Sequence, residues 1–367
     1  MLLRALTAAG FRNLDPHFAF TPGPRFNVIA GENGEGKTNL LEAIYLAGTL
    51  RSFRATRSDE MVTWGEARCE VGARVVRRDV ERVYKVGLGA RRLATLDGKT
   101  PRTLGEYFGD FNVVLFAPED LRVPRGSPAH RRRFLDRSVF NRRAGFLDDA
   151  QRFARVLKSR NAVLRDGRRD DALLDVYDEQ LAQAGARVVA ARRRYLEELE
   201  PRFAAAHDDI TGRAAAASLT YRTDDRVAEA VADETALVGA LREELAAGRG
   251  RDAARRMTGV GPHVDDVEFR LDGRRARAFA SQGQLRALVL AWKTAEMGLL
   301  REVHGDAPIL LLDDVSSELD DRRNQLLFDL LARIECQSFV TTTHPKHVLT
   351  SQDRQDFRMV AGRLEPC

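Results

Sequence analysis

Residues 31–38 read GENGEGKT and match the pattern G-x-x-x-x-G-K-[ST], which is typical of a phosphate-binding loop. The short apolar run RFNVIA precedes them at residues 25–30, and apolar residues at helical spacing follow from Thr38. This order predicts a strand, a loop and a helix. Glycines let the backbone wrap closely around a phosphate, and the amino end of the helix presents positive charge to it. The stretch therefore predicts a nucleotide site within an α/β fold.

Each residue type in this loop suits a nucleoside triphosphate. We expect Lys37 to reach the β- and γ-phosphates of ATP, and the Thr38 hydroxyl to bind Mg²⁺. Catalysis of phosphoryl transfer would also depend on Lys37. The other members of the predicted ATP-binding segment are Gly31, Glu32, Asn33, Gly34, Glu35, Gly36 and Asn39.

Residues 309–314 (ILLLDD) supply the acidic partner that such a loop needs. Four aliphatic residues in a row predict a strand that is buried on both faces. Asp313 then lies at the carboxyl edge of the sheet, where α/β proteins bind ligands, and we expect it to hold Mg²⁺. Asp314 follows and is placed to polarise an attacking water. For Asp314 alone, a helix cap is the open alternative.

A second phosphate cradle is predicted at residues 281–284 (SQGQ), which open a helix about thirty residues before the acidic pair. Ser281 offers a hydroxyl, Gly283 permits close approach, and Gln282 and Gln284 flank them. Because Lys37 already serves its own nucleotide, this cradle would receive the ATP of a second copy of the chain. As an isolated tetrapeptide it would be only a helix cap.

These motifs resemble the ATP-binding-cassette (ABC) ATPases, particularly the DNA-repair branch with SMC-type heads, and within that branch the RecF family. The resemblance covers nearly the whole chain. Its specific segments are residues 31–44 (GENGEGKTNLLEAI), 118–136 (PEDLRVPRGSPAHRRRFLD) and 313–320 (DDVSSELD).

The resemblance implies further roles in binding ATP. Residues 281–284 correspond to the ABC signature, and residues 316–320 to the D-loop, whose Asp320 would lie at the nucleotide. His344, after the strand-like FVTTT, corresponds to a switch histidine that contacts the γ-phosphate. Arg12 corresponds to a residue near the nucleotide. For His344 and Arg12, an ordinary surface position is the open alternative.

Two departures from transporter-type cassettes matter for catalysis. Asp314 stands where those proteins usually have glutamate, and its shorter side chain should hold a water less well, so we expect slow hydrolysis. Residues 117–120 (APED) stand where those proteins have a glutamine, which leaves the role of Glu119 open.

The charge of the chain is strongly uneven. Residues 121–169 contain 15 Arg or Lys against 4 Asp or Glu, a local +11, whereas the whole chain has a net charge of +5. Such a block either binds nucleic-acid phosphates or forms a solvated helical surface. Three consecutive arginines, 131–133, cannot share one face of a helix, so at least one should pack on protein or pair with an acid such as Asp136. The candidate DNA-binding residues are Arg131, Arg132, Arg142, Arg143, Arg152, Arg155 and Lys158.

The chain is expected to form an α/β ATPase head of the ABC/SMC type, with a mixed P-loop sheet and flanking helices, plus an inserted, mainly helical lobe. The head would comprise residues 1–125 and 255–367, and the lobe residues 126–254. Two helical stripes occupy residues 148–200, and Pro201 should end or kink the second helix. Residues 275–279 (RARAF) suggest a strand. Three scattered cysteines and the lack of a long apolar run favour a cytoplasmic protein.

The resemblance implies an ATP-dependent DNA-binding protein of recombinational repair with weak, DNA-dependent ATPase activity. An ATP-driven homodimer would bind double-stranded DNA, single-strand gaps or junctions, and would help to load RecA together with RecR. An ABC-type transport ATPase subunit and a non-hydrolysing ATP switch remain alternatives. A long-armed SMC protein is disfavoured, because 367 residues without sustained heptads leave no room for an extended coiled coil.

Overall fold

The computed structural model describes residues 1–166, 170–230, 233–314, 321–350 and 353–367. The chain divides into two compact units, the first formed by Met1–Leu121 with Lys293–Cys367 and the second by Arg122–Trp292. The first unit is therefore assembled from both ends of the chain. The helix α9 (Gln282–His304) begins in the second unit and ends in the first.

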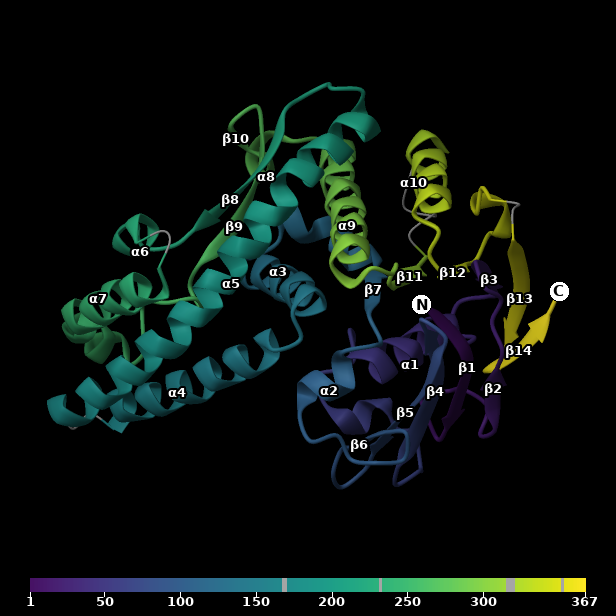
Figure 1. Cartoon of the computed structure of the whole chain (residues 1–367), viewed down its shortest axis with the longest axis horizontal. Helices are drawn as coiled ribbons and strands as arrows, with labels where there is room; N and C mark the ends of the chain where they lie inside the picture. Colours follow the sequence, from purple (N-terminus) through teal and green to yellow (C-terminus); the bar gives the residue numbers. More distant parts are fainter. Residues whose placement is uncertain (167–169, 231–232, 315–320, 351–352) are drawn as a thin grey trace. The chain divides into compact units, whose positions relative to one another are not determined.

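A six-stranded sheet forms the centre of the first unit, in the order β14-β13-β3-β12-β11-β7 (Figure 1). All neighbouring strands are parallel except β13 and β14, which are antiparallel. The strand β11 is buried throughout, as its four aliphatic residues predict. The strands are β3 (Phe26–Ala30), β7 (Val113–Phe116), β11 (Ile309–Asp313), β12 (Ser338–Thr342), β13 (Arg354–Val360) and β14 (Arg363–Pro366).

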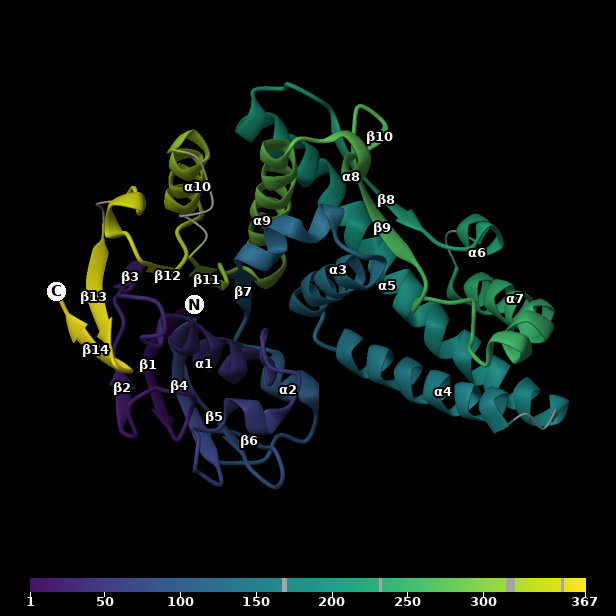
Figure 2. The same ribbon diagram turned by 180° about the vertical axis from the view of Figure 1, so that it is seen from behind.

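A second, five-stranded antiparallel sheet of this unit has the order β2-β1-β4-β5-β6. The helix α1 (Lys37–Thr49) contacts strands of both sheets, and 11 of its 13 residues are buried. Figures 1 and 2 show it beside β4 and β5. Helix α1 is thus held from two sides, which fixes the loop at its amino end. The strands are β1 (Leu2–Ala9), β2 (Phe18–Phe20), β4 (Cys69–Arg77), β5 (Val80–Leu88) and β6 (Leu93–Leu96); the unit also contains the helices α2 (Leu104–Phe108) and α10 (Asp321–Ile334).

The second unit is mainly helical, and the long helix α5 (Asp171–Thr211) is its central element. It packs against α4 (Phe146–Asp166), α7 (Glu234–Arg255) and α3 (Pro128–Arg142) (Figure 2). Trp292 is fully buried and its ring contacts four aromatic rings of this unit: Phe134, Tyr195, Phe203 and Phe269. The remaining elements are β8 (Ala217–Arg222), α6 (Asp225–Glu229), β9 (Asp266–Leu271), β10 (Arg274–Arg275) and α8 (Ala276–Phe279).

The inserted lobe is longer than the sequence predicts. Its first boundary, after Leu121, lies close to the expected position, but its second lies after Trp292 rather than at residue 254. Pairing of β9 with β8 and β10 keeps residues 266–275 in the sheet of the lobe, and the contacts of Trp292 with aromatic rings of the lobe keep the first half of α9 there. Strand pairing and aromatic packing together thus decide a boundary that composition alone misplaces.

One local expectation is wrong in part and another is wrong outright. The helix α5 continues through Pro201 to Thr211, so the proline does not end it, and a kink at this residue stays a prediction. Neighbouring packing supports this long helix, because residues on both sides of Pro201, including Leu199 and Phe203, are fully buried. The segment 275–279 leaves its strand after Arg275 and continues as the short helix α8.

Among the described residues, none of the helices combines the length and the apolar character that crossing a membrane requires.

Candidate functional site

The loop between β3 and α1 has the backbone of a phosphate cradle. Gly34 and Gly36 have φ angles of 88° and 111°, a left-handed conformation that favours glycine. At Gly36, a side chain would also meet Asn13 Oδ1 at 2.9 Å. At Gly31, a Cβ atom would lie 2.5 Å from the carbonyl oxygen of Met359. The glycines are therefore required by the conformation and the close packing of this loop.

The Lys37 side chain reaches from the first residue of α1 back to the start of the loop. It donates hydrogen bonds of 2.7 Å and 2.8 Å to the carbonyl oxygens of Gly31 and Glu32. Burial lowers the pKa of Lys37, while the negative charges of Asp314 and Asp313 act in the opposite direction. This buried cation lies beside a cavity of about 190 Å³, to which it contributes positive charge.

Two polar side chains hold the carboxylate at the end of β11. The hydroxyls of Thr38 and Thr341 each donate a 2.8 Å hydrogen bond to Asp313 Oδ1. Burial raises the pKa of Asp313, although these two hydrogen bonds lower it. Among the described residues, Asp313 has no salt-bridge partner. A buried carboxylate with a hydroxyl at hydrogen-bond distance fits a Mg²⁺ ion, which prefers oxygen ligands and takes most of them from phosphates and water.

Asp314 leaves the strand in an unusual backbone conformation. Its φ angle is 50°, and its backbone N–H donates to the carbonyl and hydroxyl oxygens of Thr341. The residue lines the same cavity as Lys37 and Thr38. The turn therefore places a second carboxylate at the predicted phosphate site.

The predicted loop residues divide into two groups. The cavity is lined by the following residues of the predicted segment: Asn33, Gly34, Gly36, Lys37, Thr38 and Asn39. The other three hold the loop in place. Gly31 and Glu32 accept the hydrogen bonds of Lys37, and the Glu35 carboxylate accepts the backbone N–H of Ala361. The Glu35 side chain is therefore directed to the β13–β14 turn and not to the cavity.

Arg12 binds the P-loop helix and does not line the cavity. Its guanidinium makes two hydrogen bonds, of 2.8 Å and 2.9 Å, to the buried Glu42 carboxylate of α1, and a third to the carbonyl of Glu60. Contact with a nucleotide thus stays a prediction for Arg12. The next residue, Asn13, donates to the Gly34 carbonyl at 2.7 Å and accepts from Asn39 at 2.6 Å. This segment braces the loop.

Arg54 is a candidate residue that sequence reasoning missed. It lines the cavity but belongs to none of the predicted nucleotide-binding motifs. Its guanidinium donates a hydrogen bond of 3.3 Å to Asn39 Oδ1. Its position depends on how the segment after α1 turns back over the loop, and no spacing in the sequence indicates that turn. Its charge adds to that of Lys37 in the cavity.

His344 follows β12 at the edge of the sheet where Asp313 ends the neighbouring strand. Its backbone N–H donates to the Thr342 hydroxyl at 3.0 Å, and its ring is exposed near that of His347. It does not line the cavity in this structure, so its contact with a γ-phosphate stays a prediction. The D-loop expectation, including Asp320, falls on residues outside the described part of the chain.

The predicted signature forms the amino end of α9. The Ser281 hydroxyl accepts the backbone N–H of Gln284 at 3.2 Å, and the Gln284 side chain accepts the N–H of Ser281 at 2.8 Å. This reciprocal pair is a capping box. Gln282 is exposed and Gly283 half-buried, so the helix end is open to solvent. The segment belongs to the second unit, whereas the P-loop belongs to the first.

The basic block separates into buried and exposed arginines. Arg131 is only 2% exposed and forms a bidentate ion pair with Asp266, which removes it from the candidate DNA face. This confirms that one of the three consecutive arginines pairs with an acid, although Asp136 binds Arg192 instead. Arg132 is half-buried and donates a hydrogen bond to the carbonyl of Asp265, so it too makes a contact within the fold.

The other members of the predicted DNA face lie nearer the surface. Arg142 pairs with Glu198 and Arg143 with Asp149. Arg152, Arg155 and Lys158 are exposed on α4 and have no ion-pair or hydrogen-bond partner among the described residues. Their spacing of three residues keeps them on one side of the helix. DNA contact by these residues stays a prediction.

Comparison with known proteins decides the family. No family model matches the chain. The DNA replication and repair protein RecF of Myxococcus xanthus (strain DK1622) is 48% identical over 346 residues, covering 94% of this chain and 91% of that protein. The chain belongs to the RecF family. Membership in this family of DNA replication and repair proteins leaves no support for a transport ATPase subunit.

Solved structures agree with this RecF assignment. The recombination mediator protein RecF-ATPrS in the RecFOR pathway is similar with a TM-score of 0.91 and 31% identity, over 100% of this chain and 98% of that one. The SmcHead bound to the C-winged helix domain of ScpA has a TM-score of 0.57 and 16% identity, over 100% of this chain and 97% of that one. The latter likeness shows the fold alone. The fold is that of an ABC/SMC-type ATPase head, as expected.

Proposed function

We propose that this protein binds ATP with Mg²⁺ and uses the bound nucleotide to control its binding to DNA during recombinational repair. The observation that carries the proposal is the hydrogen bond of 2.8 Å between Thr38 of the P-loop and Asp313 of β11. It brings the two predicted Mg²⁺ ligands together at the edge of one cavity with the Lys37 ammonium. Bound Mg²⁺ would neutralise phosphate charge there.

Slow ATP hydrolysis follows from Asp314. Its carboxylate would orient a water for in-line attack on the γ-phosphorus, so that the bond from phosphorus to the β–γ bridging oxygen breaks and ADP leaves. The water proton would pass to a carboxylate or to phosphate. The short side chain should position this water less well than a glutamate would. This supports turnover that serves as a switch.

A closed dimer would complete the nucleotide site. The Ser281 hydroxyl and the exposed amino end of α9 suit the γ-phosphate of ATP bound to a second copy. In the isolated chain the same groups cap their own helix, and closing on ATP would exchange that contact for one to phosphate. Asp320, His344 and Arg12 are proposed to act at this closed site.

The DNA substrate and the partners are proposed from family membership. A protein that acts in the RecFOR pathway is a relative of this chain. We therefore propose that the chain acts on double-stranded DNA, single-strand gaps or junctions, works with RecR, and assists in loading RecA.

The test combines three measurements on the full chain: sedimentation, DNA binding and phosphate release, each with and without ATP and Mg²⁺. We expect dimers and tight DNA binding only with both ligands. Phosphate release should be slow and should fall further in Asp314→Asn. Equal, background release by wild type and Asp314→Asn would favour the non-hydrolysing switch. DNA binding that ignores ATP would contradict the proposal.

A further inference from the structure

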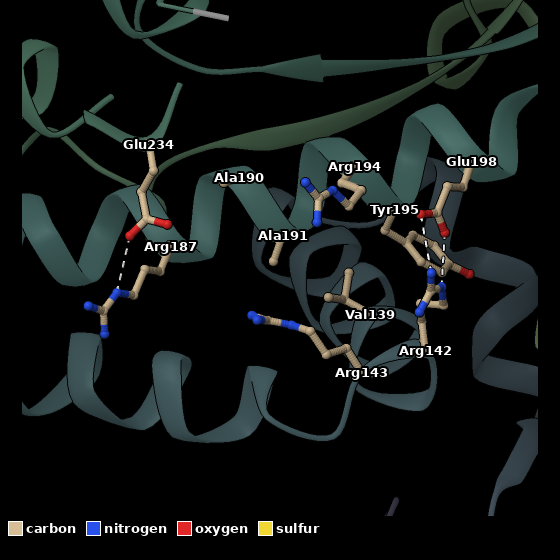
Figure 3. A pocket seen from close by; sticks show the side chains of 10 residues that line it. All are labelled: Val139, Arg142, Arg143, Arg187, Ala190, Ala191, Arg194, Tyr195, Glu198 and Glu234. Atoms are coloured by element: carbon tan, nitrogen blue, oxygen red, sulfur yellow. Dashed lines mark hydrogen bonds and ion pairs between the residues drawn. The ribbon is translucent and has the colours of Figure 1, made fainter. Parts of the chain in front are cut away.

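A cavity of about 250 Å³ lies in the second unit, between the carboxyl end of α3 and the middle of α5. Four of its ten lining residues are arginines: Arg142, Arg143, Arg187 and Arg194. Figure 3 shows the ion pairs Arg142–Glu198 and Arg187–Glu234 at opposite ends, with Arg143 and Arg194 between them. Among the residues that the structure describes, none of the nucleotide motifs contributes to this cavity.

The sequence of α5 explains the open space. Arg187 and Arg194 are seven residues apart, so they lie on one face of the helix, about 10 Å from each other along its axis. Ala190 and Ala191 occupy the turn between them and line the floor of the cavity. Two small side chains between two long cationic ones leave room for a ligand that both arginines can reach.

Carboxylates hold three of the four guanidinium groups in place. Arg142 binds Glu198 through two nitrogens, Arg143 binds Asp149, and Arg187 binds Glu234 through Nε alone. Arg194 has no hydrogen bond or ion pair with any residue that the structure describes. The four guanidinium groups thus outnumber these three carboxylates by one. The site is pre-arranged, and its remaining charge is one positive unit.

We propose that this arginine pocket, defined by Arg142, Arg143, Arg187 and Arg194, binds one backbone phosphate of DNA. A phosphodiester carries one negative charge, which matches the uncompensated charge of the pocket. The planar guanidinium fork suits two phosphate oxygens. The helix α4 begins three residues after Arg143 and carries exposed Arg152, Arg155 and Lys158, so a polyanion leaving the pocket meets further single charges.

The inference rests on the proposed DNA-binding function, and it adds Arg187 and Arg194 of α5 to the candidate face. The test titrates fluorescently labelled gapped DNA with the full chain, ATP and Mg²⁺ at several KCl concentrations. Arg194→Ala should weaken binding about tenfold and lower the slope of log affinity against log salt by about one. Glu198→Gln, which frees Arg142 from its carboxylate, should strengthen binding.

The matched control is Arg255→Ala. Arg255 is an exposed arginine with no partner in the described chain, at the far end of α7 and roughly 30 Å along that helix from Glu234. It should retain wild-type affinity and slope. Equal losses in both variants would mean a general charge effect and would overturn the pocket. Wild-type DNA binding by Arg194→Ala would also overturn the proposal. This holds even if the variant loses binding to a poly-glutamate peptide, because the pocket would then bind an acidic peptide and not DNA. If the wild-type protein showed no ATP-dependent DNA binding, that result would instead contradict the proposed function itself.

Discussion

The Thr38 hydroxyl donates a hydrogen bond of 2.8 Å to Asp313 Oδ1, although 275 positions separate the two residues. The contact joins the first turn of α1 to the carboxyl end of β11, two elements from opposite ends of the chain. A buried carboxylate and a hydroxyl that meet in this way are ready to share one cation. Most of the proposed chemistry depends on this pair.

Asp313→Asn should weaken Mg²⁺-dependent ATP binding by more than about tenfold, because the ion loses the buried carboxylate that would ligate it. Burial raises the pKa of Asp313, so the folded state binds its proton more tightly than the unfolded state does. Stability of the nucleotide-free protein therefore falls as the pH rises through the titration of this carboxyl. The neutral variant should lose that pH dependence. Thermal unfolding with and without Mg²⁺-ATP measures both effects, with the exposed Glu197→Gln as control; a full ATP-dependent shift in Asp313→Asn contradicts the assignment.

Lys37→Met should reduce ATP affinity at least about hundredfold and thereby prevent dimerisation and tight DNA binding, since the loop loses its ammonium. Lys37→Arg should keep part of the binding but hydrolyse poorly, because a planar fork does not replace a compact ammonium. Equilibrium binding of a fluorescent ATP analogue measures the affinities. Wild-type affinity in Lys37→Met would rule out this loop as the nucleotide site.

Ser281→Arg should leave ATP binding by the monomer intact while it prevents dimer closure, because a bulky cation would fill the space for the partner's γ-phosphate. Sedimentation with ATP reads the oligomeric state. Ser281→Asp is the control for the helix itself, since aspartate is also a good N-cap. Normal dimers of Ser281→Arg would exclude a shared site.

Arg131→Ala should destabilise the second unit by about 3 kcal/mol, because it leaves the Asp266 carboxylate without the arginine that it pairs with. For a unit of this size that loss lowers the midpoint of thermal unfolding by about 6–12 °C. DNA affinity of the folded variant at low temperature should be unchanged. Calorimetry and DNA titration together separate the two roles; a weaker, salt-dependent DNA complex with unchanged stability would return Arg131 to the DNA face.

Arg152→Ala should weaken DNA binding equally for all sequences and lower the salt slope by about one, the result of one lost phosphate contact. Stability should not change, since the exposed side chain has no partner in the described chain. Titrations at several salt concentrations on two unrelated sequences measure this. A flat response would place the DNA site elsewhere and leave α4 as a solvated helix.

The sequence by itself determined the elements whose signals are local. The glycine pattern of residues 31–38, the aliphatic run before Asp313 and the Ser281 cap all depend on backbone sterics or periodicity within a few residues. The fold class could therefore be predicted. The structure brings Lys37 and Asp313 to the edge of one cavity, and their roles toward a nucleotide stay predictions.

Only the tertiary structure decided which arginines form buried contacts within the fold. Composition marks the whole block 121–169 as basic, but it cannot show that Arg131 meets Asp266 from a strand 135 residues away, or that Arg187 and Arg194 face a cavity. Pairing of β8 with β9 likewise kept residues 266–271 in the inserted lobe, and packing supported a continuous α5 helix through Pro201. These outcomes depend on contacts between distant elements, which charge and periodicity do not encode because many partners satisfy the same local pattern.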